Sequence, residues 1–265
     1  MHERWSKWAR RASIVLAGSA VVLFAVPTVM ASAAAPRPYT CAGGSVPSGT
    51  YASLTIAGFC QVDSGPVTVV RGVSVNAGAG LLAVFSGSDL VVGGNLAVGD
   101  KGILALGCLP SSFPCFNFSG GTTHHRIAGD VTGSSALMML VHGNRIGGQA
   151  VQTGGGGGRT CRNFPLGPNG PPAYSTWEDN TIRRNVSILG VHTCWLGFIR
   201  NTVGQSVYYS DNVTADPDGN EFVTNTIAGN LACYRNSPAP QVGDSGGNPN
   251  TVGGRATGQC AGLTG

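Results

Sequence analysis

A short stretch near the end of the chain, GDSGG at residues 243–247, contains a serine that could act as a nucleophile. A serine hydroxyl attacks a carbonyl efficiently only when a histidine takes its proton, an acidic side chain orients that histidine, and N–H groups hold the oxyanion. His124, His125 and His192 all precede Ser245 in the chain. Whether any of them reaches the serine depends on the elements around it.

The pentapeptide resembles the stretch around the catalytic serine of the chymotrypsin-like serine proteases. That family also carries a histidine in a short Ala-His-Cys motif, and this sequence contains none. Asn250 follows shortly after and begins a copy of the repeat described below, so the pentapeptide fills a loop between two repeats. Pro, Gly, Asp and Ser are the expected residues of such a loop. We therefore expect no serine protease activity and assign no catalytic residue.

A carboxylate-rich segment, DPDGNE at residues 216–221, is the best candidate for binding a metal ion. Asp216, Asp218 and Glu221 offer the oxygen ligands that Ca²⁺ prefers. The segment lacks the further acidic positions of an EF-hand loop, and an ordinary Asp-Pro-Asp-Gly turn explains the same letters. We expect no cofactor and keep Ca²⁺ as the alternative.

Acidic, basic and aromatic side chains also gather in the second half of the chain. A polysaccharide-cleaving enzyme would need clustered carboxylates and a basic residue that takes a proton. Glu178, Asp179, Asp211 and Arg200 are available, but they stand at different offsets from the repeat asparagines and need not share a face. The aromatic rings that could contact a glycan are those of Trp177, Trp195, Tyr208 and Tyr209.

An internal repeat must position these side chains. Each copy begins with an asparagine, usually followed by threonine and then by Ile or Val, and the separations are 36, 21, 24 and 25 residues. The asparagines are Asn144, Asn180, Asn201, Asn225 and Asn250. In the first half, GLLAV at 80–84 and GILAL at 102–106 are 22 residues apart. Short β segments at this period predict a coil that returns to the same place in each turn.

The repeat asparagine has two physical uses in such a coil. Asn tolerates the left-handed backbone of a sharp bend, and its amide can bond to the Asn one coil away, so that stacked copies form a ladder. The Ile or Val two residues later is expected to point into the stack. Asn236 falls outside this register, and we expect it to take no part in a ladder.

With these motifs the chain resembles secreted right-handed parallel β-helix repeat proteins, the solenoid class that also contains the pectate lyases. Residues 41–60 and the closing segment 229–260 are similar to small exported actinobacterial proteins of this kind, most of them without an assigned activity. The resemblance implies an all-β, single-stranded right-handed parallel β-helix of about 8–10 coils with disulfide-closed ends. A β-sandwich or double barrel is the alternative, since short strands with glycine turns fit it as well.

The repeat and its interruptions suggest a division of the chain. We expect a signal peptide at 1–35, an N-terminal cap at 36–64, a β-helix at 65–235 with insertions at 107–126 and 154–172, and a closing segment at 236–265. Each coil of a solenoid touches only its neighbours, so we pair the cysteines in sequence order. The expected disulfides are Cys41–Cys60, Cys108–Cys115, Cys161–Cys194 and Cys233–Cys260.

The compartment follows from the first residues and the cysteines. A basic start, an apolar core and a small-residue exit, with cleavage after Ala33 or Ala35, are typical of a secretory signal. An even number of cysteines in the exported part indicates an oxidising environment. The signal segment holds four basic residues and one acid, which leaves about +1 of the formal charge of +4 for the remainder. Nothing in the sequence resembles the basic stripe of a nucleic-acid binder.

We therefore expect a secreted, non-catalytic β-helix protein with a structural or glycan-binding role at the cell surface or outside the cell. Its partner would be an extracellular polysaccharide or the cell envelope, with no nucleic acid and no membrane after signal cleavage. The alternative is a polysaccharide lyase or glycoside hydrolase on the same scaffold.

If Ser245 is not a nucleophile, a fluorophosphonate probe will leave the folded protein unlabelled, because an unactivated serine hydroxyl is a weak nucleophile. Ser245→Ala is expected to change the free energy of unfolding by less than about 0.5 kcal/mol. Stoichiometric labelling that disappears in Ser245→Ala would make the protein a hydrolase.

Overall fold

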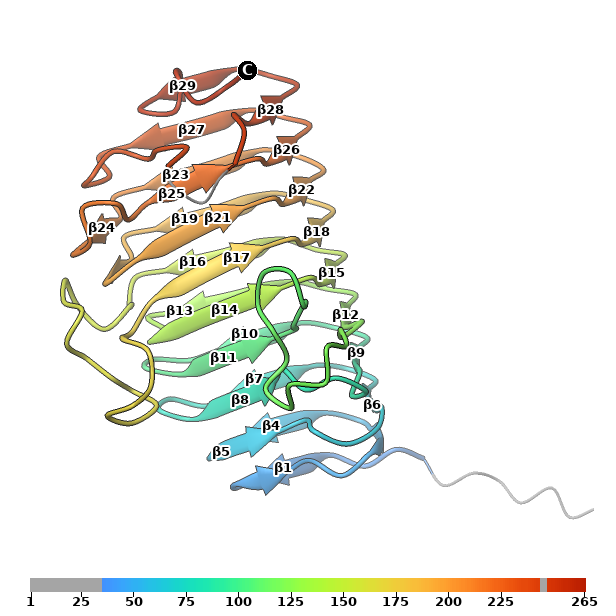
Figure 1. The fold of residues 1–265 in the computed structure, drawn as a ribbon. Coiled ribbons are helices and arrows are strands. Elements are labelled where there is room, and N and C mark those ends of the chain that lie inside the picture. Colours follow the sequence, from blue (N-terminus) through green and yellow to red (C-terminus); the bar gives the residue numbers. More distant parts are fainter. Residues whose placement is uncertain (1–34, 244–246) are drawn as a thin grey trace, which may run out of the picture. The chain divides into compact units, whose positions relative to one another are not determined.

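The regular structure consists of β-strands alone within the part of the chain that the computed structural model describes, residues 35–243 and 247–265 (Figure 1). Residues 1–34 of the expected signal peptide lie outside this part. So do Asp244, Ser245 and Gly246, and the expectation that Ser245 is no nucleophile stays a prediction. No helix long and apolar enough to cross a membrane occurs in the described ranges.

The strands form three long sheets, named A, B and C here. Sheet A has ten strands in the order β1 (Tyr39–Cys41), β4 (Leu54–Ile56), β7 (Val73–Val75), β10 (Leu96–Val98), β13 (Val131–Ser134), β16 (Ala150–Thr153), β19 (Val186–Leu189), β23 (Val207–Ser210), β27 (Leu231–Tyr234) and β29 (Ala256–Gly258). Sheet B has eight: β2 (Gly44–Ser45), β5 (Phe59–Gln61), β8 (Gly80–Ala83), β11 (Ile103–Leu106), β14 (Met138–His142), β17 (Ser175–Glu178), β21 (Leu196–Ile199) and β25 (Glu221–Val223).

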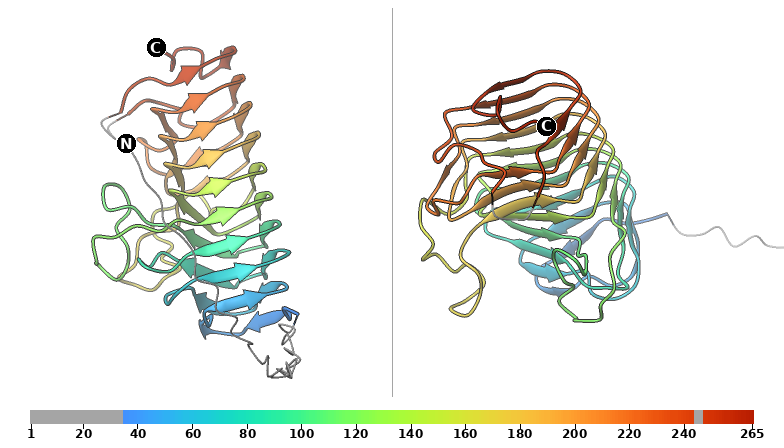
Figure 2. Two further views of the ribbon diagram at one scale, coloured as in Figure 1. Left: turned by 90° about the vertical axis from the view of Figure 1, so that its right-hand side faces the viewer. Right: turned by 45° about the horizontal axis from the view of Figure 1, so that its top comes forward.

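Sheet C has nine short strands, seen face-on in the left view of Figure 2. They are β3 (Gly49–Tyr51), β6 (Val67–Val69), β9 (Leu90–Val92), β12 (Arg126–Ile127), β15 (Arg145–Ile146), β18 (Thr181–Ile182), β22 (Thr202–Val203), β26 (Thr226–Ile227) and β28 (Thr251–Val252). A further pair, β20 (His192–Thr193) and β24 (Val213–Thr214), lies at two corners between sheets A and B.

The chain visits sheets A, B and C in turn, and each strand pairs in parallel with the strand one coil away. For example, Arg126 and Ile127 of β12 pair with Arg145 and Ile146 of β15. Parallel strands need a long connection between neighbours, and here the rest of the coil provides it. The described strands form no closed barrel, and the arrangement is consistent with a parallel β-helix solenoid. The antiparallel pairing of a β-sandwich is absent from all three sheets.

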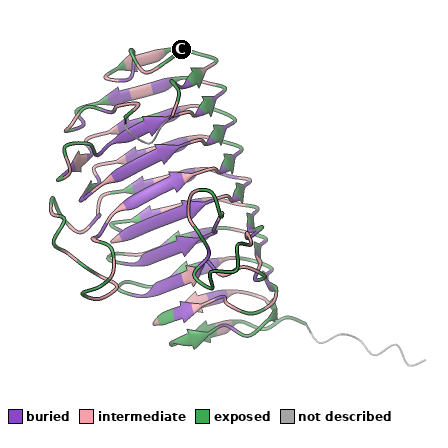
Figure 3. Ribbon diagram, in the orientation of Figure 1, coloured by how far each residue is buried: buried purple, intermediate pink, exposed green. Residues whose placement is uncertain are grey.

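The core fills the space enclosed by the three sheets (Figure 3). The Ile or Val of each repeat points inward as expected, and Ile146, Ile182 and Ile227 are at most 2% exposed. Phe198 and Phe222 on sheet B stack with ring centroids 5.0 Å apart. The same residue types therefore recur at the same depth in successive coils, and the core is built coil upon coil.

The expected asparagine ladder is present where the chain passes from sheet B to sheet C. The side-chain amide of Asn180 donates to Oδ1 of Asn201 at 3.0 Å, and that of Asn201 donates to Oδ1 of Asn225 at 3.1 Å. The backbone N–H of Asn201 donates to the same Oδ1 of Asn225 at 2.8 Å, and its amide also donates to the carbonyl of Trp177 at 2.7 Å. Asn144 and Asn250 extend the ladder to five rungs.

The expectation that the asparagines themselves occupy the left-handed bend is wrong. That conformation belongs to the residue just before them, with φ of 56° at Asp179, 54° at Arg200 and 58° at Thr224. The bend turns the chain, and the asparagine after it then presents its amide to the next coil. A non-glycine residue in this region costs about 1–2 kcal/mol, which the buried hydrogen bonds of the ladder offset.

The expectation for Asn236 is also wrong, because a second amide ladder runs along the corner after sheet A. The amide of Asn212 donates to Oδ1 of Asn236 at 3.1 Å, and the amide of Asn236 donates to Oε1 of Gln259 at 3.0 Å. Here too the preceding residues, Asp211 and Arg235, have φ of 61° and 54°. Both corners thus use a left-handed residue followed by a stacked amide.

Two insertions cover the outer face of sheet B. Residues 107–125 connect β11 to β12, and residues 154–172 lie between β16 and β17. Their apolar side chains form a second cluster outside the solenoid, in which Met138 and Leu140 of β14 pack with Cys108, Cys115 and Leu166. This cluster removes most of the outer face of sheet B from solvent.

The four disulfides join neighbouring parts of the chain in the order expected from the sequence: Cys41–Cys60, Cys108–Cys115, Cys161–Cys194 and Cys233–Cys260. The first and last link strands at the two ends of the stack, and the other two tie down the insertions. Residues 36–64 are more than a cap, since β1 to β5 already supply strands to all three sheets. Residues 236–265 likewise continue sheets C and A with β28 and β29.

Replacing Asn201 or Asn236 with alanine removes a rung from one ladder and leaves buried N–H groups unpaired. Each variant is expected to lower the free energy of unfolding by about 1–3 kcal/mol. The exposed Asn76 provides the control, and Asn76→Ala should stay within about 0.5 kcal/mol of the parent. Chemical denaturation checks this, and equal effects at all three sites would reject the ladder account.

Candidate ligand-binding site

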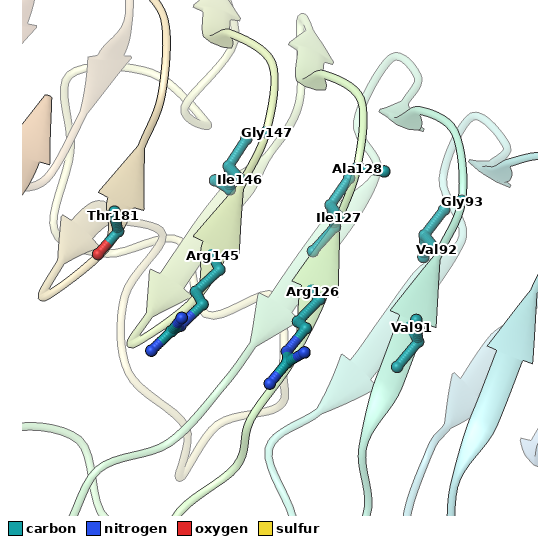
Figure 4. A pocket seen from close by; sticks show the side chains of 10 residues that line it. All are labelled: Val91, Val92, Gly93, Arg126, Ile127, Ala128, Arg145, Ile146, Gly147 and Thr181. Atoms are coloured by element: carbon teal, nitrogen blue, oxygen red, sulfur yellow. The ribbon is translucent and has the colours of Figure 1, made fainter. Parts of the chain in front are cut away.

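Two arginines stand side by side on the outer face of sheet C. Arg126 of β12 and Arg145 of β15 are direct partners in the parallel register, and both are exposed. Neighbouring strands lie about 4.8 Å apart, so the two side chains leave the sheet next to each other. Figure 4 shows their guanidinium groups extending in the same direction.

The arginines border a shallow hollow of about 420 Å³. Small residues line the bottom of the hollow. Gly93, Ala128 and Gly147 each follow the sheet C strand of one of three successive coils and leave this space unfilled. The coils pack closely there, and a Cβ on Gly147 would lie 2.4 Å from the carbonyl oxygen of Ala128. The corresponding place on the next coil is taken by the exposed Arg183. The hollow therefore spans three coils along the stack and ends at Thr181 of the next one.

Arg126 and Arg145 stand apart from the other charged side chains of the described ranges. Among residues 35–243 and 247–265, neither guanidinium takes part in an ion pair or a side-chain hydrogen bond. Like charges directly opposite each other on neighbouring strands are destabilising. The arrangement therefore costs some stability, and the scaffold alone gives no reason for it.

Elsewhere the same fold stacks opposite charges. Arg200 contacts Asp179 one coil away through Nε and Nη2 at 2.8 and 2.9 Å. Arg235 likewise contacts Asp211 at 2.6 and 2.7 Å. Both pairs occupy the left-handed columns at the two corners. Against these two matched pairs, the Arg126–Arg145 pair is the exception, and an anionic ligand would supply the missing partner.

A smaller hollow of about 80 Å³ adjoins the arginines and is lined in part by His124 and His125. The two histidines precede β12 and differ in burial. His125 is buried, with Nδ1 accepting the N–H of Leu90 at 2.8 Å and Nε2 lying 2.7 Å from the carbonyl of Ala83. Burial lowers its pKa to about 4, so His125 is neutral and structural. His124 is exposed and lies against an acid: its Nδ1 is 4.0 Å from Asp89 Oδ1, which also accepts the backbone N–H of His124 at 2.8 Å.

A second charged cluster lies at the edge of sheet B. Nη2 of Arg200 contacts Glu178 Oε2 at 2.8 Å in addition to Asp179, and Ser112 from the first insertion donates to Asp179 Oδ2 at 3.0 Å. Burial raises the pKa of Glu178, although a 2.6 Å hydrogen bond from Thr176 and the nearby arginine oppose the shift. Here one guanidinium holds both carboxylates, which are already paired.

His142 lies next to this cluster without a hydrogen bond. Its side chain is 1% exposed, and neither ring nitrogen has a partner among the described residues. The ring stacks on Phe113 of the first insertion at 4.3 Å, and Nδ1 is 4.0 Å from Glu178 Oε2. Burial lowers the pKa of His142 to about 3, opposed by Asp179 and assisted by Arg200. The imidazole is therefore neutral at physiological pH.

The expected aromatic glycan contacts do not form one platform. Trp177 and Tyr209 lie in the core at 0% exposure, so the expectation for these two is wrong. Trp195 is partly exposed between β20 and β21. Tyr208 is 50% exposed on β23 of sheet A. Inward or outward orientation follows from strand register, because successive side chains alternate between faces.

The expected calcium ligands are not brought together. Asp216 closes a turn by accepting the N–H of Asp218 at 3.0 Å, whereas Glu221 is buried in β25. Within the described residues, no group of three or more His, Cys, Asp or Glu side chains is placed to hold a metal ion. The turn explanation accounts for the segment.

Sequence reasoning missed Arg126 and Arg145 as a pair. The signal was in the repeat itself, because Arg145 occupies the position where the later copies carry threonine. Arg126 has no asparagine before it and is separated from the preceding coil by an insertion, so its register cannot be recognised in the sequence. Comparisons of the chain with models of protein families, with curated proteins and with solved structures found no match.

The buried histidines predict how stability depends on pH. An unfolded histidine gains a proton below pH about 6.5, whereas folded His142 and His125 remain neutral down to pH about 3 and 4. Stability should therefore fall as pH decreases from 6.5, by up to about 1.4 kcal/mol per pH unit for each histidine.

His142→Phe keeps the ring stack and removes the titrating group, so it should make this loss less steep between pH 6.5 and 5. His124→Gln changes an exposed histidine and serves as the control. Unfolding curves across this range check the prediction, and an unchanged slope in His142→Phe would contradict it.

Proposed function

We propose that this protein is a secreted, non-catalytic right-handed parallel β-helix that binds acidic polysaccharide through sheet C. The observation that carries the proposal is the in-register pair of exposed arginines, Arg126 and Arg145, beside a hollow and without an ion-pair partner among the described residues. Secretion is supported by the signal-like start of the sequence, and an oxidising compartment by the four disulfides.

The chemistry of the site suits a carboxylate or sulfate group on a sugar. A guanidinium binds such groups through two parallel hydrogen bonds, and charge-assisted bonds of this kind are about twice as strong as neutral ones. The remaining lining is mostly apolar, from Val91, Ala128 and the stems of the arginines. A sugar ring has an apolar face that can lie on such a floor while its acidic group reaches the arginines.

An enzyme on the same scaffold is the weaker alternative. The acids and the arginine that could do such chemistry, Glu178, Asp179 and Arg200, do meet on one sheet. They are bound to one another, however, and the first insertion contacts Asp179 and stacks on His142. A polysaccharide lyase or glycoside hydrolase would need these groups free to meet the substrate, so binding at sheet C is favoured.

The proposal predicts that Arg126→Gln and Arg145→Gln weaken binding to a polyuronate such as alginate. A hydrogen bond to a charged group contributes about 1.5–3 kcal/mol, so each variant should lose roughly tenfold or more in affinity. Isothermal titration calorimetry at low salt measures the change, with neutral dextran and dextran sulfate as additional ligands.

Arg159→Gln provides the matched control, because it removes the same charge from an exposed site on the second insertion. It should bind like the parent protein. If all three variants lose affinity equally, attraction depends on net charge alone and sheet C is not the site. Release of shortened or unsaturated products during the titration would favour the enzyme instead.

A further inference from the structure

The arginine pair stands in the middle of one straight column of outward-facing residues on sheet C. Each of the nine strands contributes one position, in direct register with the next. In order along the stack these residues are Thr50, Thr68, Val91, Arg126, Arg145, Thr181, Thr202, Thr226 and Thr251. The column contains no acidic residue, and threonines continue it on both sides of the central residues Val91, Arg126 and Arg145.

We propose that an acidic polysaccharide lies along the stack of coils, across the strands of sheet C, and follows this column. The arginines hold acidic groups on neighbouring sugars, and the threonine hydroxyls bind sugar hydroxyls on either side. This inference rests on the proposed function and adds the orientation and the length of the ligand.

The dimensions of sheet C favour this direction. Its strands are two or three residues long, which gives a face about 7–10 Å wide along the strands. Nine strands at about 4.8 Å extend it to nearly 40 Å along the stack. The hollow beside the arginines also runs over three coils in that direction. An extended chain keeps contact over its length only if it follows the stack.

The repeat spacing suits a polymer better than a small anion. Successive column positions are separated by the strand spacing, about 4.8 Å, a distance comparable with one extended sugar residue. Threonine is common on exposed strands for reasons of conformation alone, and this accounts for the hydroxyls by themselves. It does not account for two stacked arginines at the centre or for the absence of any carboxylate in the column.

The test is a length series of oligouronates, from monomer to octamer, titrated against the parent and against the double variant Thr181→Val, Thr202→Val. Valine keeps the shape and strand preference of threonine and removes the hydroxyl. Affinity should rise steadily with length in the parent. The double variant should bind the dimer nearly as well as the parent and the octamer at least threefold more weakly.

Thr55→Val with Thr132→Val makes the same change on sheet A and is the control, and it should leave the series unchanged. Thermal unfolding confirms that each variant is folded. An affinity that depends on the arginines but stops rising at the dimer would overturn the axial chain and leave the proposed function standing. No arginine-dependent binding at any length would overturn both.

Discussion

The structure depends on one interaction, the hydrogen bond from a buried side-chain amide to the equivalent amide one coil away. At two corners of the coils in the second half of the chain, the backbone bends through a left-handed residue and exposes N–H groups that no strand satisfies. The amide after the bend satisfies them, as when Oδ1 of Asn225 accepts both the N–H and the amide of Asn201. Each coil of a ladder is therefore joined to its neighbour at the corner as well as along its strands.

The path of the chain before Asn144 explains why the first ladder begins there. Asn144 is the first rung, and its Oδ1 has no partner among the described residues, because the chain one coil earlier leaves the stack in the 107–125 insertion. There the N–H of Cys108 is bound instead by the hydroxyl of Thr123 at 2.9 Å. That insertion then covers sheet B and seals His142 beneath Phe113. As a result sheet C is left as a long, regular and exposed face, and its fixed register brings Arg126 and Arg145 together.

Much of the fold was predictable from the sequence, because the spacing of the repeat copies gives the length of one coil. The asparagines of the repeat copies identified the first ladder and the inward Ile and Val, and the rule that each coil touches only its neighbours gave the order of the disulfides. The second ladder was hidden because Asn212, Asn236 and Gln259 follow three different residues and share no motif around them. The orientations of Trp177 and Tyr209 depend on register, which a one-residue shift would invert. The arginine pair could be recognised only in the structure, since the insertion before Arg126 hides its position in the repeat.

The central claim is that the parallel register of sheet C places two arginines in a position that serves binding at some expense to stability. The most direct test is the free energy of unfolding of Arg145→Gln, with and without a saturating polyuronate. Without the polymer the variant should be at least as stable as the parent, because it relieves the repulsion between like charges. With the polymer the parent should gain stability by linkage and the variant should gain little. A variant that is less stable without polymer, and that gains as much as the parent with it, would show that the pair is structural and would contradict the account.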